Sequence, residues 1–136
     1  MLNNSAHLDG DWLWNVNPFS LDDPRLRDGD ESMSFALGRY LKSKFDYVIF
    51  SSCIVVDKEI RDTIFANINY KDFRVIGFTL TCSKEVLKER HYGQGATYEV
   101  AYSWLKMKTY PNDYLIQTDN KNIKEVSEEI YSLIMK

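Results

Sequence analysis

Residues 6–19 read AHLDGDWLWNVNPF, which places two aspartates around a glycine and follows them with two tryptophans and an Asn-Pro pair. The segment Ser5–Asp9 is a weakly apolar run, and it predicts a short strand that ends at the first aspartate. Ligands of open α/β sheets bind at the carboxyl ends of the strands. Asp9 and Asp11 therefore stand where a parallel strand would present its ligand-binding residues.

Three further apolar runs also have the length of strands. They are Tyr47–Ile54, Arg74–Thr81 and Tyr114–Thr118. Runs this short and this apolar are typical of strands buried on both faces, as in a parallel sheet. We therefore expect four parallel strands in this chain.

The first segment of helical period lies between the first two predicted strands. Its apolar residues recur at helical spacing and predict a helix over Glu31–Lys44. The stripe consists of Met33, Ala36, Leu37, Tyr40 and Leu41. We expect Asp28, Asp30 or Ser32 to cap this helix.

Two more amphipathic helices are predicted, over Lys58–Ile68 and from Asn122 onward. Asn122 and Glu125 have the spacing of a capping box, which marks the start of the last helix. The expected buried face of that helix consists of Ile123, Val126, Ile130, Leu133 and Ile134.

Residues 83–112 interrupt the regular alternation of strands and helices. Ser83 is expected to cap a short helix over Lys84–His91, after which Gly93-Gln94-Gly95 breaks the pattern. A second helix is predicted over Thr97–Thr109, and Pro111 is expected to end it. Two helices separated by glycines between two strands indicate a lid-like region.

The order of these elements predicts an α/β fold, with a three-layer parallel sheet that carries helices on both faces. No internal repeat, linker or low-complexity segment divides residues 1–136. We therefore expect a single domain over residues 1–136, with residues 83–112 as its lid-like region.

The composition of the chain limits its partners. The 17 basic and 20 acidic residues give a net charge of −3, which argues against nucleic-acid binding. No run is long and apolar enough for a membrane span, and no signal peptide is visible, so we expect a cytoplasmic protein without membrane partners. Cys53 and Cys82 are expected to be buried thiols, and His7 and His91 lack partners at metal-ligand spacing.

The segment after the first predicted strand carries the candidate chemistry. One carboxylate of Asp9 and Asp11 would orient or deprotonate an acceptor hydroxyl, and the other would hold Mg²⁺ through water. Gly10 would let the backbone turn and approach the ligand, while Trp12 and Trp14 would wall a planar or sugar-like acceptor. The alternative is structural, because Asp-Gly is common in turns and tryptophan in cores.

These residues resemble a known family. LDGDW resembles the second strand of small P-loop kinases, such as the gluconate kinase, adenylylsulfate kinase and chloramphenicol phosphotransferase relatives, and the opening is most similar to bacterial AAA-family ATPases or nucleotide-kinase-like proteins. YVIFSSCI resembles the Walker-B-like strand, and VIGFTLTCSKEVLKER resembles the fourth strand and the start of the lid. YLIQTDNKNIKEVSEEI resembles the last strand, the adenine loop and the final helix. The pieces occur in the family's order along almost the whole chain.

The resemblance implies transfer of the γ-phosphoryl group of ATP to a small molecule or nucleotide, with Mg²⁺. Asp9 and Asp11 would be the catalytic residues, with Asp11 at the metal, and Trp12 and Trp14 would bind the acceptor. On the cofactor side, the resemblance places Arg90 at the phosphates and Thr118, Asn120 and Lys121 beside the adenine. The lid lacks the second arginine of many relatives, since HYGQGATYEVAYSW follows Arg90.

The P-loop itself is the largest departure from the family, because no GxxxxGK[ST] motif occurs in the sequence. The family places this motif before LDGDW, so we expect a truncated or degenerate kinase-like chain with very weak or no phosphoryl transfer. The family's strand order is 2-3-1-4-5, so the absent strand is the central one. The exposed edges of Tyr47–Ile54 and Arg74–Thr81 would then close on each other, pair with a second copy, or leave the protein poorly stable.

Two other interpretations remain open. A non-catalytic binding module would use the aromatic pocket at Trp12 and Trp14 for a ligand or a partner. A flavodoxin-like regulatory domain is also compatible with the α/β pattern, and it gives LDGDW no role.

Overall fold

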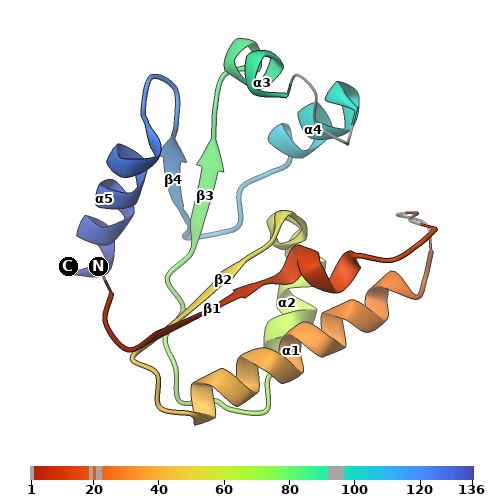
Figure 1. The fold of residues 1–136 in the computed structure, drawn as a ribbon, viewed down its shortest axis with the longest axis vertical. Coiled ribbons are helices and arrows are strands. Elements are labelled where there is room, and N and C mark those ends of the chain that lie inside the picture. The colour runs from red at the N-terminus through yellow and green to blue at the C-terminus, as the bar shows by residue number, and fades with distance from the viewer. Residues whose placement is uncertain (1, 19, 21–22, 92–96) are drawn as a thin grey trace. The chain divides into compact units, whose positions relative to one another are not determined.

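The computed structural model describes residues 2–18, 20, 23–91 and 97–136 (Figure 1). The chain divides into two compact units, Met1–Arg74 and Val75–Lys136, which we call the N-terminal and C-terminal units. Each unit combines helices with one pair of parallel strands. The predicted α/β class with short parallel strands is therefore confirmed.

The sheet of the N-terminal unit consists of β1 (Ser5–Asp9) and β2 (Tyr47–Ser51), which run parallel with Asp9 opposite Ser51. A 3₁₀ helix follows each strand directly, η1 (Gly10–Trp14) after β1 and η2 (Cys53–Val56) after β2. The bounds of β1 agree with the prediction. The second strand ends at Ser51 instead of Ile54 because the chain turns into η2.

Two helices complete the N-terminal unit, α1 (Leu26–Lys42) and α2 (Lys58–Ala66). Helix α1 contacts both strands and α2, and the core lies between these elements. The buried apolar residues of this unit are Trp14, Leu26, Met33, Leu37, Ile54, Ile64 and Ile68. The predicted apolar stripe of α1 thus supplies part of the core.

The predicted start of α1 was wrong. The helix begins at Leu26, so the three expected caps, Asp28, Asp30 and Ser32, lie inside it. The N-cap residue is Arg25, and it makes no capping bond with its side chain. The carboxylate of Asp23 instead accepts a hydrogen bond from the Arg25 backbone N–H at 2.9 Å, which extends the helix toward the N-terminus.

Asp30 is a carboxyl group that α1 buries, and this burial affects its pKa. It is 6% exposed, and its Oδ2 lies 3.4 Å from Nη1 of Arg27. Burial raises the pKa of Asp30 above its usual value, and the Arg27 charge offsets only part of this effect. A carboxyl with a raised folded pKa contributes stability at low pH that is lost as the pH rises through that pKa.

We therefore expect Asp30→Asn to gain stability relative to the wild type over the pH range that begins at about 4, the usual pKa of an aspartate, and extends to the raised pKa of Asp30. Thermal unfolding of both proteins across this range measures the difference in Tm. A difference that is constant, or that falls with pH, would contradict the effect of burial on Asp30.

The C-terminal unit contains the second sheet, in which β3 (Phe78–Thr81) runs parallel to β4 (Tyr114–Gln117). Its helices are α3 (Lys84–Arg90), α4 (Tyr98–Leu105) and α5 (Ile123–Ile134). The Ser83 hydroxyl caps α3 by accepting from the Val86 N–H, as predicted. The capping box of Asn122 and Glu125 at the start of α5 is also confirmed.

Several expected boundaries in this unit differ from the structure. Strand β3 begins at Phe78 rather than Arg74, and α4 ends at Leu105, well before Pro111. Ile123 is 87% exposed because it stands in the first turn of α5, whereas the other residues of the predicted face are half-buried. The predicted break at Gly93-Gln94-Gly95 lies outside the described residues.

The strands are not buried on both faces, contrary to the prediction. Ile49 is 44% exposed in β2, Leu80 56% in β3 and Leu115 59% in β4. Within the described residues, β2 pairs with β1 in the N-terminal unit, and β3 pairs with β4 in the C-terminal unit. The apolar composition of these runs therefore exceeds what the helices of either unit cover.

Candidate ligand-binding site

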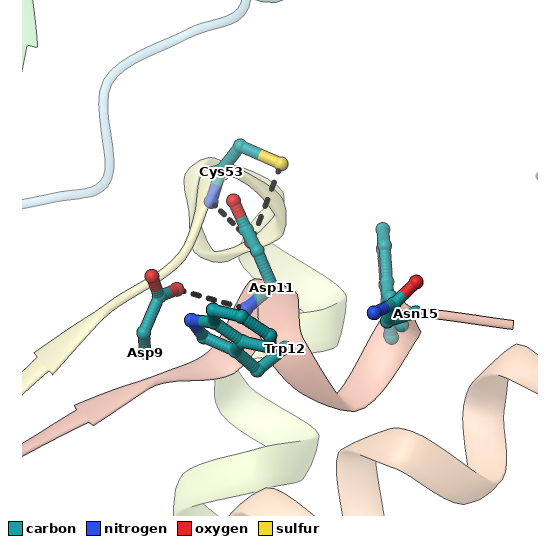
Figure 2. A pocket seen from close by; sticks show the side chains of 6 residues that line it. Asp9, Asp11, Trp12, Asn15 and Cys53 are labelled. Atoms are coloured by element: carbon teal, nitrogen blue, oxygen red, sulfur yellow. Dashed lines mark hydrogen bonds between the residues drawn. The ribbon is translucent and has the colours of Figure 1, made fainter.

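An open pocket of about 430 Å³ lies at the carboxyl ends of β1 and β2 (Figure 2). Its lining residues are Asp9, Asp11, Trp12, Trp14, Asn15 and Cys53. The first is the last residue of β1, the next four belong to η1 or follow it, and Cys53 begins η2. The parallel pairing places the ends of both strands together, so the pocket is built from segments about forty residues apart.

Asp11 connects the ends of the two strands. Its Oδ1 accepts hydrogen bonds from the Ser52 hydroxyl at 2.6 Å, the Cys53 N–H at 3.2 Å and the Cys53 thiol at 3.6 Å. Asp9 caps η1, because its Oδ1 accepts from the Asp11 N–H at 3.1 Å. Both predicted carboxylates therefore line one pocket, and their backbone and side-chain bonds hold them in place (Figure 2).

The two tryptophans have different environments although both line the pocket. Trp12 is 73% exposed, whereas Trp14 is 8% exposed and packs beside Gly29 of α1. The Arg27 guanidinium stacks on the Trp14 ring, 5.0 Å from the ring centroid. Trp14 is thus part of the core and also part of the pocket wall, whereas the exposed Trp12 indole is accessible to a ligand.

Gly10 has a packing role that the sequence prediction missed. It is buried, and a Cβ atom at this position would lie 2.9 Å from Phe50 Cε2 and from Ser52 Cβ, and 3.1 Å from Met33 Sδ. Glycine is required here because η1 packs closely on β2 and α1. This packing role adds to the expectation that Gly10 brings the backbone to a ligand, which stays a prediction.

Cys53 is exposed rather than buried as predicted, and it is a free thiol. Loss of hydration beside the pocket wall, together with the negative charge and hydrogen bond of Asp11, raises its pKa to about 11. The thiol therefore remains protonated near neutral pH and donates to the Asp11 carboxylate.

This pKa predicts slow modification of Cys53. At about pH 8, such a thiol has on the order of a hundredfold less thiolate than an ordinary cysteine. In a Cys82→Ser background, the reaction with a disulfide reagent should be slower than in the urea-unfolded protein by about that factor, and Asp11→Asn should accelerate it. Equal rates in the folded and unfolded protein would contradict the environment described for Cys53.

The predicted cofactor residues belong to the C-terminal unit, at the carboxyl ends of β3 and β4. Arg90 donates from Nη1 to Thr118 Oγ1 at 2.7 Å and from Nη2 to the Thr118 carbonyl at 2.8 Å. The Thr118 hydroxyl in turn donates to the Thr81 carbonyl at 2.8 Å. The structure thus brings Arg90 and Thr118 together and joins α3 to the ends of both strands.

The loop after Thr118 contains the other two predicted residues. Asn120 has a positive φ of 56°, which asparagine tolerates in turns. Lys121 forms an ion pair with Glu129 of α5, with 2.6 Å between Nζ and Oε2. Asp119, which the prediction omitted, accepts from the Ser83 N–H at 2.9 Å. This loop is therefore held to α3 and α5 by its own side chains.

Ser52, Cys53 and Asn15 are the site residues that sequence reasoning missed in the N-terminal unit. A usable signal was present for the first two, because they follow the second strand of a parallel pair and such ends share one edge. No comparable signal marks Asn15.

In comparisons with known proteins, no protein-family model and no curated protein matches this chain. Among the described residues, no helix is long and apolar enough to cross a membrane. In the same part of the chain, no three His, Cys, Asp or Glu side chains gather as a metal site.

Proposed function

We propose that this chain is a P-loop kinase-like protein whose pocket at the end of β1 binds the acceptor of a phosphoryl transfer. One observation carries the proposal: Asp9 and Asp11 line the same pocket as the exposed Trp12 at the carboxyl end of a parallel strand. The parallel pairing of both strand pairs is also what such a fold requires. The proposal includes a three-layer arrangement of the complete sheet.

The two carboxylates suit an acceptor hydroxyl. Asp11 uses Oδ1 for the bonds from Ser52 and Cys53, and Asp9 uses Oδ1 for the η1 cap. The Oδ2 atoms take no part in these bonds and would accept hydrogen bonds from a ligand. A hydroxyl held there would lose its proton to a carboxylate as its oxygen attacks the γ-phosphorus of ATP, and the bond from that phosphorus to the bridging oxygen would break to release ADP.

ATP and Mg²⁺ complete the proposal as cosubstrate and metal. Asp11 would reach the ion through Oδ2 or through water, since Mg²⁺ keeps several waters in such sites. To bind a phosphate, the Arg90 guanidinium would give up at least one of its two hydrogen bonds to Thr118 and donate to a phosphate oxygen instead. Because the sequence has no GxxxxGK[ST] motif, we expect weak binding of ATP·Mg²⁺ to this polypeptide and slow transfer at most.

A non-catalytic binding module is the second candidate, and a specific observation favours it. Arg90 is engaged by Thr118 and Lys121 by Glu129, so both cations assigned to the nucleotide already have partners within their own unit. In this case the pocket at Trp12 would bind its ligand without transfer.

An assay with γ-labelled ATP, Mg²⁺ and a panel of sugars and nucleosides separates these candidates. The kinase proposal expects slow labelling of an acceptor that Asp9→Asn abolishes. Asp46→Asn is the matched control, because it removes an exposed carboxylate at the opposite end of β2. Calorimetric binding of an acceptor without labelling would establish the binding module, and no binding of any acceptor would overturn both.

A further inference from the structure

The charged side chains that line the pocket are all acidic within the described residues. The described lining contains two carboxylates and no lysine, arginine or histidine. Arg27 contacts the lining residue Trp14 by stacking on its ring, and it is paired with Asp30 inside the N-terminal unit. A ligand with a phosphate or carboxylate group would therefore meet repulsion from Asp9 and Asp11, and no cationic side chain of the described lining would offset it.

Trp12 adds an independent observation. The Trp12 indole is 73% exposed and lines the pocket, so its ring is accessible to a ligand. Tryptophan also has the aromatic face that binds cations best. A ring face flanked by carboxylates suits a ligand with a flat surface and a positive charge.

Cys53 reports the same electrostatic environment. After loss of hydration, the negative charges of Asp11 and Asp9 are among the causes that raise the pKa of this thiol. The loss of hydration penalises a charge of either sign, but the charges of Asp11 and Asp9 disfavour an added negative charge and favour a positive one.

We infer that the acceptor is a protonated primary amine on a hydroxylated ring, the chemistry of an amino sugar. The ammonium group would pair with the Asp9 carboxylate, which leaves Asp11 for the metal and the reacting hydroxyl, while the ring would stack on Trp12 and Asn15 would contact other ring hydroxyls. A pocket of about 430 Å³ is of the size used for small molecules. The inference rests on the proposed acceptor role of the pocket, and it excludes nucleotides and acidic sugars as acceptors.

Three probes with one ring scaffold test the sign of the ligand charge: D-glucosamine, D-glucose and D-glucuronate. Calorimetry on the full chain should show binding of glucosamine about 10- to 100-fold tighter than that of glucose, and no binding of glucuronate. Asp9→Asn should remove most of this preference while it keeps an oxygen that can cap η1. Asp46→Asn, matched in charge, should preserve the preference.

The outcomes separate this inference from the proposed function. Equal affinities for the three sugars, or tighter binding of glucuronate, would overturn the amine inference and leave a sugar-binding pocket. Binding of none of them would overturn the inference together with the acceptor role. A glucosamine preference that persists unchanged in Asp9→Asn would place the amine elsewhere and overturn the inference as well.

Discussion

Gly10→Ala should lower the free energy of unfolding by about 1–3 kcal/mol, because the added methyl group overpacks a closed contact. The new Cβ atom would lie 2.9 Å from Phe50 Cε2 and Ser52 Cβ. Ser52 cannot retreat easily, since it directly follows β2 and its hydroxyl donates a hydrogen bond to Asp11. Urea unfolding followed by circular dichroism measures the loss.

Gly38→Ala is the matched control for this substitution. Gly38 lies inside α1, and its Cβ atom would meet ordinary contacts at 3.5 Å from Asn69 N and 3.8 Å from Ile68 Cγ2. Alanine in a helix interior is favoured over glycine by roughly 1 kcal/mol, so this variant should be neutral or more stable. Equal losses in the two variants would show that the close packing of η1 does not set the cost.

Met33→Ala has the largest expected effect on stability, a loss of about 2–5 kcal/mol. Met33 is 0% exposed in α1, and its Sδ would lie 3.1 Å from a Cβ atom on Gly10. Its truncation leaves a cavity beneath η1. Met135→Ala is the control, because Met135 is 57% exposed and the same truncation there should cost little.

A double variant links the two predictions. Met33→Ala removes one of the three close contacts that a Gly10 methyl group would make. The loss of stability in the Gly10→Ala, Met33→Ala protein should therefore be smaller than the sum of the single losses. Strict additivity would mean that residues 10 and 33 do not share the packing described here.

The features that sequence predicted well depend on neighbouring residues. The capping bonds of Ser83 and Asn122 involve partners three residues away, and β1 ends where the Asp-Gly pair interrupts its apolar run. The predicted start of α1 was wrong for a related reason. Several residues could serve as its cap, and the bond from Arg25 to Asp23 decided the choice.

Features that depend on distant residues were not predictable in this way. The exposure of Ile49 and Leu115 follows from how much of each sheet the helices cover, which no local pattern encodes. The same difference between local and distant contacts separates the site residues that were predicted from those that were not. Asp9, Asp11, Trp12 and Trp14 were predicted from one continuous segment, whereas the bonds of Ser52 and Cys53 to Asp11 depend on the register of β1 with β2.

The central claim is that the carboxyl ends of β1 and β2 form the ligand site, and NMR chemical-shift mapping with D-glucosamine tests it most directly. We expect shifts in the backbone amides of residues 9–15 and 52–53 and in the Trp12 indole N–H, while the Trp104 indole in α4 stays unchanged. Shifts confined to the C-terminal unit, or none at saturating sugar concentration, would contradict the claim.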